Sequence, residues 1–212
     1  MIFDDRKQAG QMLAEKLLKF REHDNVIVLA LPRGGLPVGY EIAQAIDAKL
    51  DVFLVRKLGA PMQPELAMGA ISSGGITAMN DDVVKTLHIS REKIDSVIED
   101  EKKELKRREQ AYRGERPFPA LSGSIVILVD DGIATGATMK AAVKAVQTKN
   151  PEKLVAAVPT GPKPSCEALQ DMTDETVCLS TPEPFQAIGQ WYREFSQLSD
   201  DDVRDYLDRS EQ

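Results

Sequence analysis

The sequence lacks several features that define particular classes of protein. It has only two cysteines, Cys166 and Cys178, and neither belongs to a Cys-x-x-Cys pair or a Cys/His cluster. This argues against a zinc site and a disulfide scaffold, so we expect two buried or half-buried thiols. No apolar run approaches the length of a membrane span, and the first residues lack the pattern of a secretory signal. We therefore expect a cytoplasmic protein without a membrane partner.

An excess of basic charge is also missing. The 212 residues include 27 Lys and Arg against 34 Asp and Glu, a formal net charge of -7, which argues against general affinity for nucleic acid. The two histidines, His23 and His88, lie far from any motif, so a catalytic or metal role is not indicated for them. Hydrophobic residues make up 42% and charged residues 29%, as is ordinary for one globular domain over residues 1–212.

Short apolar strands alternate with helical patterns along most of the chain. Strands are predicted at residues 26–31, 51–56, 125–129, 153–158 and 175–179, and helices at 6–21, 37–46, 139–149 and 165–171. A glycine turn, Pro32-Arg-Gly-Gly35, joins the first of these strands to the helix that follows it. The resulting βαβ units predict an α/β fold with a largely parallel, doubly wound sheet and flanking helices.

Three segments fall outside this alternation. Residues 57–68 contain two prolines and no periodicity, so they are expected to form a long binding loop, followed by a hairpin at 69–79. Residues 80–122 are predicted to be a helical insertion, with a charge-laced helix at 91–112 whose charges face solvent. The tail, residues 181–212, is expected to form a small hood that ends in an acidic helix capped by Ser199.

The most informative stretch is Ser124 to Thr138. An apolar strand ends on two carboxylates, Asp130 and Asp131, and a loop of small residues then leads into a helix. Ligands of open α/β sheets bind at the carboxyl ends of the strands, and a helix N-terminus favours anions. This arrangement suits a ligand that carries both hydroxyl groups and a phosphate.

Residues 127–138, ILVDDGIATGAT, resemble the phosphoribosyl pyrophosphate (PRPP) motif of type I phosphoribosyltransferases. The resemblance implies that Asp130 and Asp131 are catalytic and hold the ribose hydroxyls, directly or through Mg²⁺ as metal ligands. It further implies a cradle for the 5-phosphate made by Gly132, Ala134, Thr135, Gly136, Ala137 and Thr138.

The same resemblance extends to two basic sites. Arg33, Gly34 and Gly35 match the pyrophosphate loop of the family, which often contains a cis peptide, here between Pro32 and Arg33. Arg56 and Lys57 are similar to a basic pair that contacts pyrophosphate just before a mobile loop. Within that loop, Glu65 is either a general acid/base or a solvated charge.

The tail is similar to the hood of purine-salvage members, which implies that Phe185 and Trp191 bind the base. Ala134 departs from the hypoxanthine-guanine type, which has an aspartate there. A methyl group cannot transfer a proton, so Ala134 argues against a 6-oxopurine mechanism and leaves the acceptor open.

The resemblance implies an enzyme that transfers 5-phosphoribosyl from PRPP to a nucleobase-like acceptor with Mg²⁺ as cofactor and releases pyrophosphate. Relatives are often dimers, so a homodimer stays open. Two alternatives remain. One is a regulatory protein that senses PRPP, with a basic surface at Arg107, Arg108 and Arg113. The other is a phosphate-sugar hydrolase that uses the same aspartates.

Overall fold

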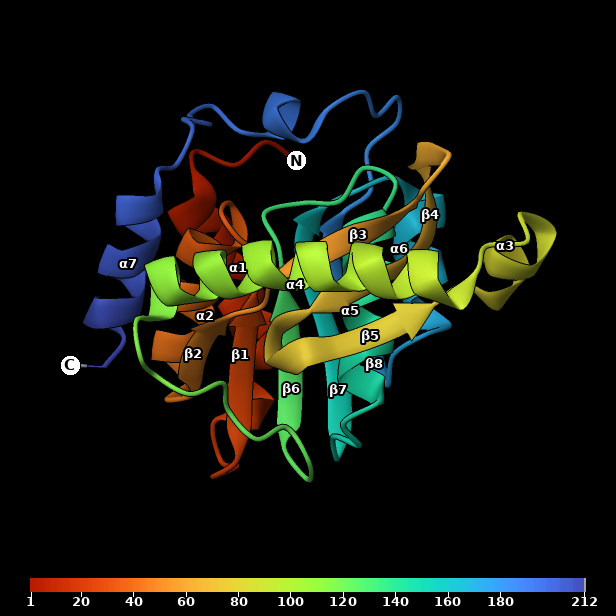
Figure 1. Ribbon diagram of the computed structural model, residues 1–212. Coiled ribbons are helices and arrows are strands. Elements are labelled where there is room, and N and C mark those ends of the chain that lie inside the picture. The colour runs from red at the N-terminus through yellow and green to blue at the C-terminus, as the bar shows by residue number, and fades with distance from the viewer. Residues whose placement is uncertain (212) are drawn as a thin grey trace.

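The computed structural model describes residues 1–211, and its centre is a five-stranded sheet (Figure 1). The strand order is β2-β1-β6-β7-β8 and every pairing is parallel. The strands are β1 (Val26–Ala30), β2 (Lys49–Val52), β6 (Ile125–Val129), β7 (Lys153–Thr160) and β8 (Glu175–Ser180). The predicted α/β fold is thereby confirmed. The order reverses between β1 and β6, and such a switch point is where open α/β sheets bind ligands.

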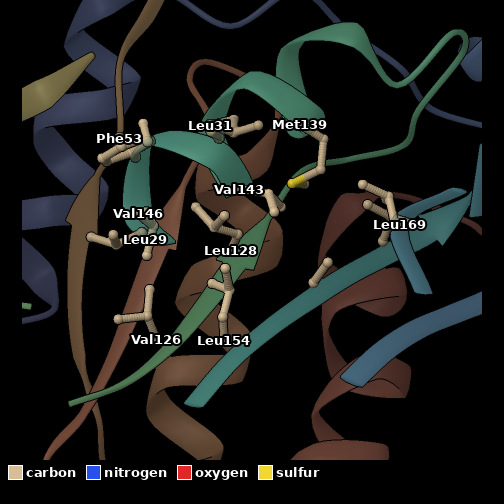
Figure 2. Close-up of a cluster of buried hydrophobic side chains, with 14 of the residues drawn as sticks. Leu29, Leu31, Phe53, Val126, Leu128, Met139, Val143, Val146, Leu154 and Leu169 are labelled. Atoms are coloured by element: carbon tan, nitrogen blue, oxygen red, sulfur yellow. The ribbon is translucent and has the colours of Figure 1, made fainter. Parts of the chain in front are cut away.

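Helices cover both faces of this sheet, as the alternation predicted. On one face, α1 (Arg6–Leu17) and α2 (Gly35–Ile46) pack on Ile125, Ile127 and Val129 of β6. On the other, α5 (Ala137–Gln147) and α6 (Lys163–Gln170) pack on Val126 and Leu128 (Figure 2). Because successive strand residues point to opposite faces, the unbroken apolar run of β6 serves both cores.

A second, three-stranded antiparallel sheet lies beside the first. It consists of β3 (Val55–Ala60), β4 (Gln63–Ser72) and β5 (Ile76–Met79). The predicted hairpin is confirmed as β4 and β5, but the predicted loop at 57–68 is wrong, because most of it pairs as β3 and β4. Pro64 is compatible with this pairing since β5 joins β4 only from Gly69 onward, so Pro64 occupies an edge stretch.

The insertion is helical, as predicted, with α3 (Asp81–Thr86) and α4 (Arg91–Arg113). In Figure 1, α4 crosses in front of the sheets. Its buried residues Ile94, Leu105 and Tyr112 join a core that also contains residues of β3 and β4. The expected basic surface is wrong in one respect: Arg113 is buried and donates to Asp51 at 2.9 Å. The position of Arg113 along α4 places its side chain on the face toward the sheet, away from solvent.

The N-terminal segment meets the tail above the carboxyl edge of the parallel sheet, whereas the C-terminal end of the described chain lies further away, beyond the last helix (Figure 1). Phe3 forms a parallel bridge with Tyr192, and both are buried with Ala9. The tail contains the short η3 (Ile188–Trp191) and α7 (Asp200–Arg209). Ser199 and Asp202 form the capping box of α7, which confirms the predicted cap.

The expectation of two thiols is wrong, because Cys166 of α6 and Cys178 of β8 are joined as a disulfide with their Cα atoms 6.4 Å apart. The packing of α6 against β8 brings the two together, and this tertiary contact has no signature in their 12-residue spacing. Among residues 1–211, no helix is long and apolar enough to cross a membrane.

Candidate active site

The two aspartates stand at the carboxyl end of β6, where the strand order reverses. Asp131 is 7% exposed, and its Oδ2 accepts a hydrogen bond from Nε of Arg6 at 2.7 Å. The Tyr192 hydroxyl donates to the backbone oxygen of Asp131 at 2.5 Å, and the Asp131 amide donates to Oδ1 of Asp130 at 2.9 Å. The tail and the N-terminal helix therefore both fix the acidic pair.

Burial governs the ionisation of this pair. Burial and the adjacent Asp131 carboxylate raise the pKa of Asp130 well above its usual value. Burial also raises the pKa of Asp131, although the Arg6 guanidinium opposes that shift. Two carboxylates in one desolvated site are costly unless a cation compensates them, and Arg6 supplies one such cation.

The turn after β1 lies directly against the acidic pair. The Pro32–Arg33 peptide is cis, as the family resemblance implied. A Cβ atom placed on Gly34 would lie 1.9 Å from Oδ2 of Asp131, and one on Gly35 would lie 2.7 Å from the carbonyl oxygen of Val129. Both positions thus require glycine for reasons of space, because any side chain would push the turn away from β6.

The loop after the aspartates leads into the N-terminus of α5. Gly136 caps the helix in the left-handed region, at φ 72°, which glycine adopts without strain. Ser165 donates to the carbonyl of Ala134 at 2.8 Å, and the Ala137 amide donates to the Thr135 hydroxyl at 3.4 Å. Thr135, Ala137 and Thr138 are exposed, so the amides at the start of α5 are accessible to an anion.

One cavity of about 540 Å³ joins these parts. Its lining includes Arg33 and Gly34 of the turn, Asp131, and Thr138 of the loop. It also includes four groups of residues that the sequence analysis did not place there: Arg6 of α1, Arg108 and Tyr112 of α4, residues 53–55 after β2, and residues 195–198 of the tail. The carboxyl edge of the sheet thus holds a cleft with both signs of charge.

Several predicted site residues do not line this cavity. Arg56 is paired with Glu101 of α4, and Lys57 lies 3.3 Å from Glu65, whose side chain is fully exposed on the β3–β4 hairpin. Phe185 and Trp191 stack on each other in the hood, with ring centroids 6.1 Å apart. Their roles in binding or catalysis stay predictions.

The hood nevertheless touches the loop between β6 and α5. A Cβ on Gly132 would lie 2.6 Å from Cγ2 of Ile188, which stands between Phe185 and Trp191 in sequence. Ile188 therefore packs against the loop that follows the acidic pair.

Arg6 is the main residue that sequence reasoning missed. Its guanidinium lies 3.9 Å from the ring centroid of Phe195, and Nη1 donates to the carbonyl of Ser196 at 2.9 Å. Arg6 therefore connects the acidic pair to the tail, across 190 residues. No local pattern identifies it, because at the start of an amphipathic helix an arginine is normally a solvated residue.

The carboxylates can be compared with the needs of Mg²⁺. Among residues 1–211, no group of three or more His, Cys, Asp and Glu side chains could enclose a metal ion. Mg²⁺ usually binds through one or two carboxylates together with substrate phosphates. The pair Asp130 and Asp131 fits an ion that arrives with a phosphorylated ligand.

Comparisons with known proteins identify the family of the chain. The family model described as phosphoribosyl transferase domain matches residues 3–192. A Mycobacterium tuberculosis H37Rv protein, described as a candidate phosphoribosyl transferase, is 47% identical over 209 residues, which is 99% of this chain and 47% of that protein. A protein of strain CDC 1551 with the same description gives the same figures. The chain thus spans about half the length of the curated relatives it matches.

Two solved structures show the same architecture. TT1426 from Thermus thermophilus has a TM-score of 0.87 and 39% identity, with 98% of each chain covered. The AQ2163 protein from Aquifex aeolicus has a TM-score of 0.51 and 14% identity, covering 95% of this chain and 84% of the other. The second likeness concerns the fold alone.

Proposed function

The chain belongs to the phosphoribosyl transferase family, and we propose that it transfers the 5-phosphoribosyl group of PRPP to a nitrogenous base and releases pyrophosphate. The observation that carries this proposal is the shared cavity. Arg33 and Gly34 come from one stretch of the chain, Asp131 and Thr138 come from another, and all four line one cleft. A turn for pyrophosphate, carboxylates for ribose and a helix N-terminus for phosphate are the parts that PRPP requires.

In this proposal, the ribose 5-phosphate lies over the start of α5. Amides of residues 135–138 donate to its oxygens, and the helix dipole stabilises its charge. Asp130 and Asp131 accept hydrogen bonds from the ribose hydroxyls. Because β6 and α5 are both packed in the core, this end of the substrate is held in a fixed position and the reacting carbon is oriented.

The pyrophosphate lies along the turn at Arg33 and Gly34. Arg33 offers charge-assisted donors, and its present partners, Asp200 and the carbonyl of Leu198, are both in the tail. Pyrophosphate that binds Arg33 would therefore compete with the tail. As the bond to ribose breaks, negative charge accumulates on the leaving oxygen, and fixed cations in a sheltered cleft stabilise that charge.

The donor set fits Mg²⁺ that is brought in by PRPP. Asp130 and Asp131 would hold the ion, and when bound it would neutralise charge on the pyrophosphate oxygens. The chain's own contribution is separate from that of the ion. Arg6 fixes Asp131, and the contact between Gly34 and Asp131 sets the spacing between the two halves of the substrate site.

The acceptor is the part of the reaction that this cavity defines least. We propose that Phe185 and Trp191 stack on a planar base. Glu65 is a weaker candidate for the general acid/base, because it lies on an exposed hairpin and would have to move to reach the cavity. Ala134 offers no proton-transfer group, so a base of the 6-oxopurine type is not favoured.

A binding experiment tests the donor site without knowledge of the acceptor. We expect calorimetry to detect Mg-PRPP binding to the wild type, and we expect the double variant Asp130→Asn/Asp131→Asn to lose it while keeping its fold. Unchanged affinity for Mg-PRPP in that variant would disprove the assignment of the two aspartates to the PRPP site. A panel of bases with Mg-PRPP, read by mass spectrometry, then separates the alternatives: base-dependent pyrophosphate release indicates a transferase, turnover with water alone a hydrolase, and binding without turnover a sensor.

A further inference from the structure

We propose that Arg108, on the inserted helix α4, is a pyrophosphate-binding residue of the PRPP site. This inference rests on the proposed function and deepens it. The insertion at residues 80–122 has no assigned role, and its main helix was interpreted as a solvated charged surface. The cavity lining shows that one end of this helix reaches the cleft.

Arg108 lies at the cleft. Arg108 and Arg33 line the same cavity, together with Tyr112, one helical turn beyond Arg108. The Tyr112 hydroxyl donates to Oδ1 of Asp200 at 2.7 Å, and Nε of Arg33 donates to the same oxygen at 2.9 Å. These two bonds attach the end of α4 to the turn after β1. Arg108 is therefore carried into the cleft by a packed helix.

The arginines of the cavity differ in their carboxylate partners. The other two arginines of the cavity already have carboxylate partners, Arg6 with Asp131 and Arg33 with Asp200. Within residues 1–211, Arg108 pairs only with Glu104, and Glu104 is shared with Arg107. The three side chains Glu104, Arg107 and Arg108 thus carry one net positive charge.

The shared carboxylate makes Arg108 easy to release. If Arg108 turns to a ligand, Glu104 keeps two hydrogen bonds from Arg107, at 2.7 and 2.9 Å. No buried or unpaired carboxylate is left behind, so the exchange costs little. Arg108 is 44% exposed in its side chain, which leaves it room to rotate toward the cleft.

Pyrophosphate is a highly charged anion. Its charge calls for more than one guanidinium, and Arg56 and Lys57, the other predicted partners, are paired with Glu101 and Glu65 and lie outside the cavity lining. Arg108 approaches from α4, whereas Arg33 approaches from the turn. Two guanidinium groups that converge from separate elements can each make two parallel hydrogen bonds to phosphate oxygens.

The test compares two adjacent arginines that share one carboxylate. We expect Arg108→Ala to weaken binding of Mg-pyrophosphate and of Mg-PRPP about tenfold by calorimetry, as loss of a charge-assisted hydrogen bond implies. Arg107→Ala removes the same charge from the neighbouring position, outside the cavity lining, but leaves Glu104 paired with Arg108 alone, so it is expected to weaken binding less than Arg108→Ala does, by about threefold. Arg108→Lys should recover part of the affinity, since it restores charge but not the paired donors.

Two outcomes would overturn the inference. One is an Arg108→Ala affinity within about twofold of wild type. The other is equal weakening by Arg107→Ala, which would reflect the general electrostatic field of the helix. Thermal unfolding confirms that each variant is folded, and Arg108→Gln replaces Arg108→Ala if truncation unfolds the chain. If wild type fails to bind PRPP, the proposed function fails. If wild type binds and Arg108→Ala binds equally well, only this inference fails.

Discussion

Nε of Arg6 lies 2.7 Å from Oδ2 of Asp131, and both side chains are about one-tenth exposed. A cation from the first helix thus neutralises the second aspartate of the predicted ribose site. Removal of one partner from a buried pair leaves the other charge without compensation and costs about 3 kcal/mol. We expect Arg6→Gln to lower the free energy of unfolding by about that amount, as measured by urea denaturation.

The coupling between these two residues can be isolated. In a double-mutant cycle, Asp131→Asn should reduce the cost of Arg6→Gln, because no buried carboxylate is then orphaned. Arg193→Gln is a suitable control, since Arg193 pairs with Asp4 near the same chain end but both side chains are mostly exposed. Additive effects of Arg6→Gln and Asp131→Asn would show that the ion pair does not stabilise the site.

Gly34→Ala tests the close approach of the turn to β6. The new methyl carbon would lie 1.9 Å from Oδ2 of Asp131, so the turn or the carboxylate must move. We expect a loss of stability of about 1–3 kcal/mol and a loss of measurable Mg-PRPP binding by calorimetry. Gly75→Ala serves as the control. A Cβ atom at residue 75 would meet no atom within 4 Å, but the backbone φ there is 70°, so this variant should lose stability and keep its affinity for Mg-PRPP. Normal binding by Gly34→Ala would disprove the spatial requirement.

Tyr112 is predicted to control the ionisation of Asp200. The hydrogen bond from Tyr112, followed by the charge of Arg33, lowers the pKa of Asp200. A carboxylate whose pKa is depressed by folding stabilises the fold above its unfolded pKa, and this contribution is lost as the pH falls through the lower, folded value. Tyr112→Phe should therefore move the pKa of Asp200 upward in an NMR titration. Tyr206→Phe, on α7 itself, should leave it unchanged, and equal shifts in both variants would contradict the assignment.

The β3–β4 hairpin should behave as an ordered sheet. Because β4 pairs with β3 on one side and with β5 on the other over Gly69–Ser72, we expect slow hydrogen exchange for the amides in that stretch. Residues 114–120, outside any helix or strand, should exchange quickly and provide the internal comparison. Equally fast exchange in both segments would contradict the pairing of β4 with both β3 and β5.

The contrast between β6 and this hairpin shows what sequence can predict. Ile125 to Val129 could be predicted as a strand, because an unbroken apolar run of that length before two aspartates and a loop of small residues is typical of a strand buried on both faces. Residues 57–68 carry prolines and little apolar periodicity, and their pairing depends on a partner strand and on α4. Arg6 and Arg108 were missed for a related reason: each lies in a helix whose local pattern indicates solvent, and only tertiary packing brings them to the cleft.

The hood offers a direct test of acceptor binding, because Trp191 is the single tryptophan of the chain. Its ring stacks on Phe185 at an interplanar angle of 22°, and the adjacent Ile188 contacts the loop at Gly132. A base that inserts beside these rings should change the fluorescence of Trp191 only when PRPP is already bound. Phe185→Leu should raise the KM for the acceptor about tenfold through lost stacking and leave the calorimetric Kd for Mg-PRPP unchanged. The opposite pattern, with an altered Kd for PRPP and an unaltered KM for the base, would place these aromatic residues on the donor side of the site.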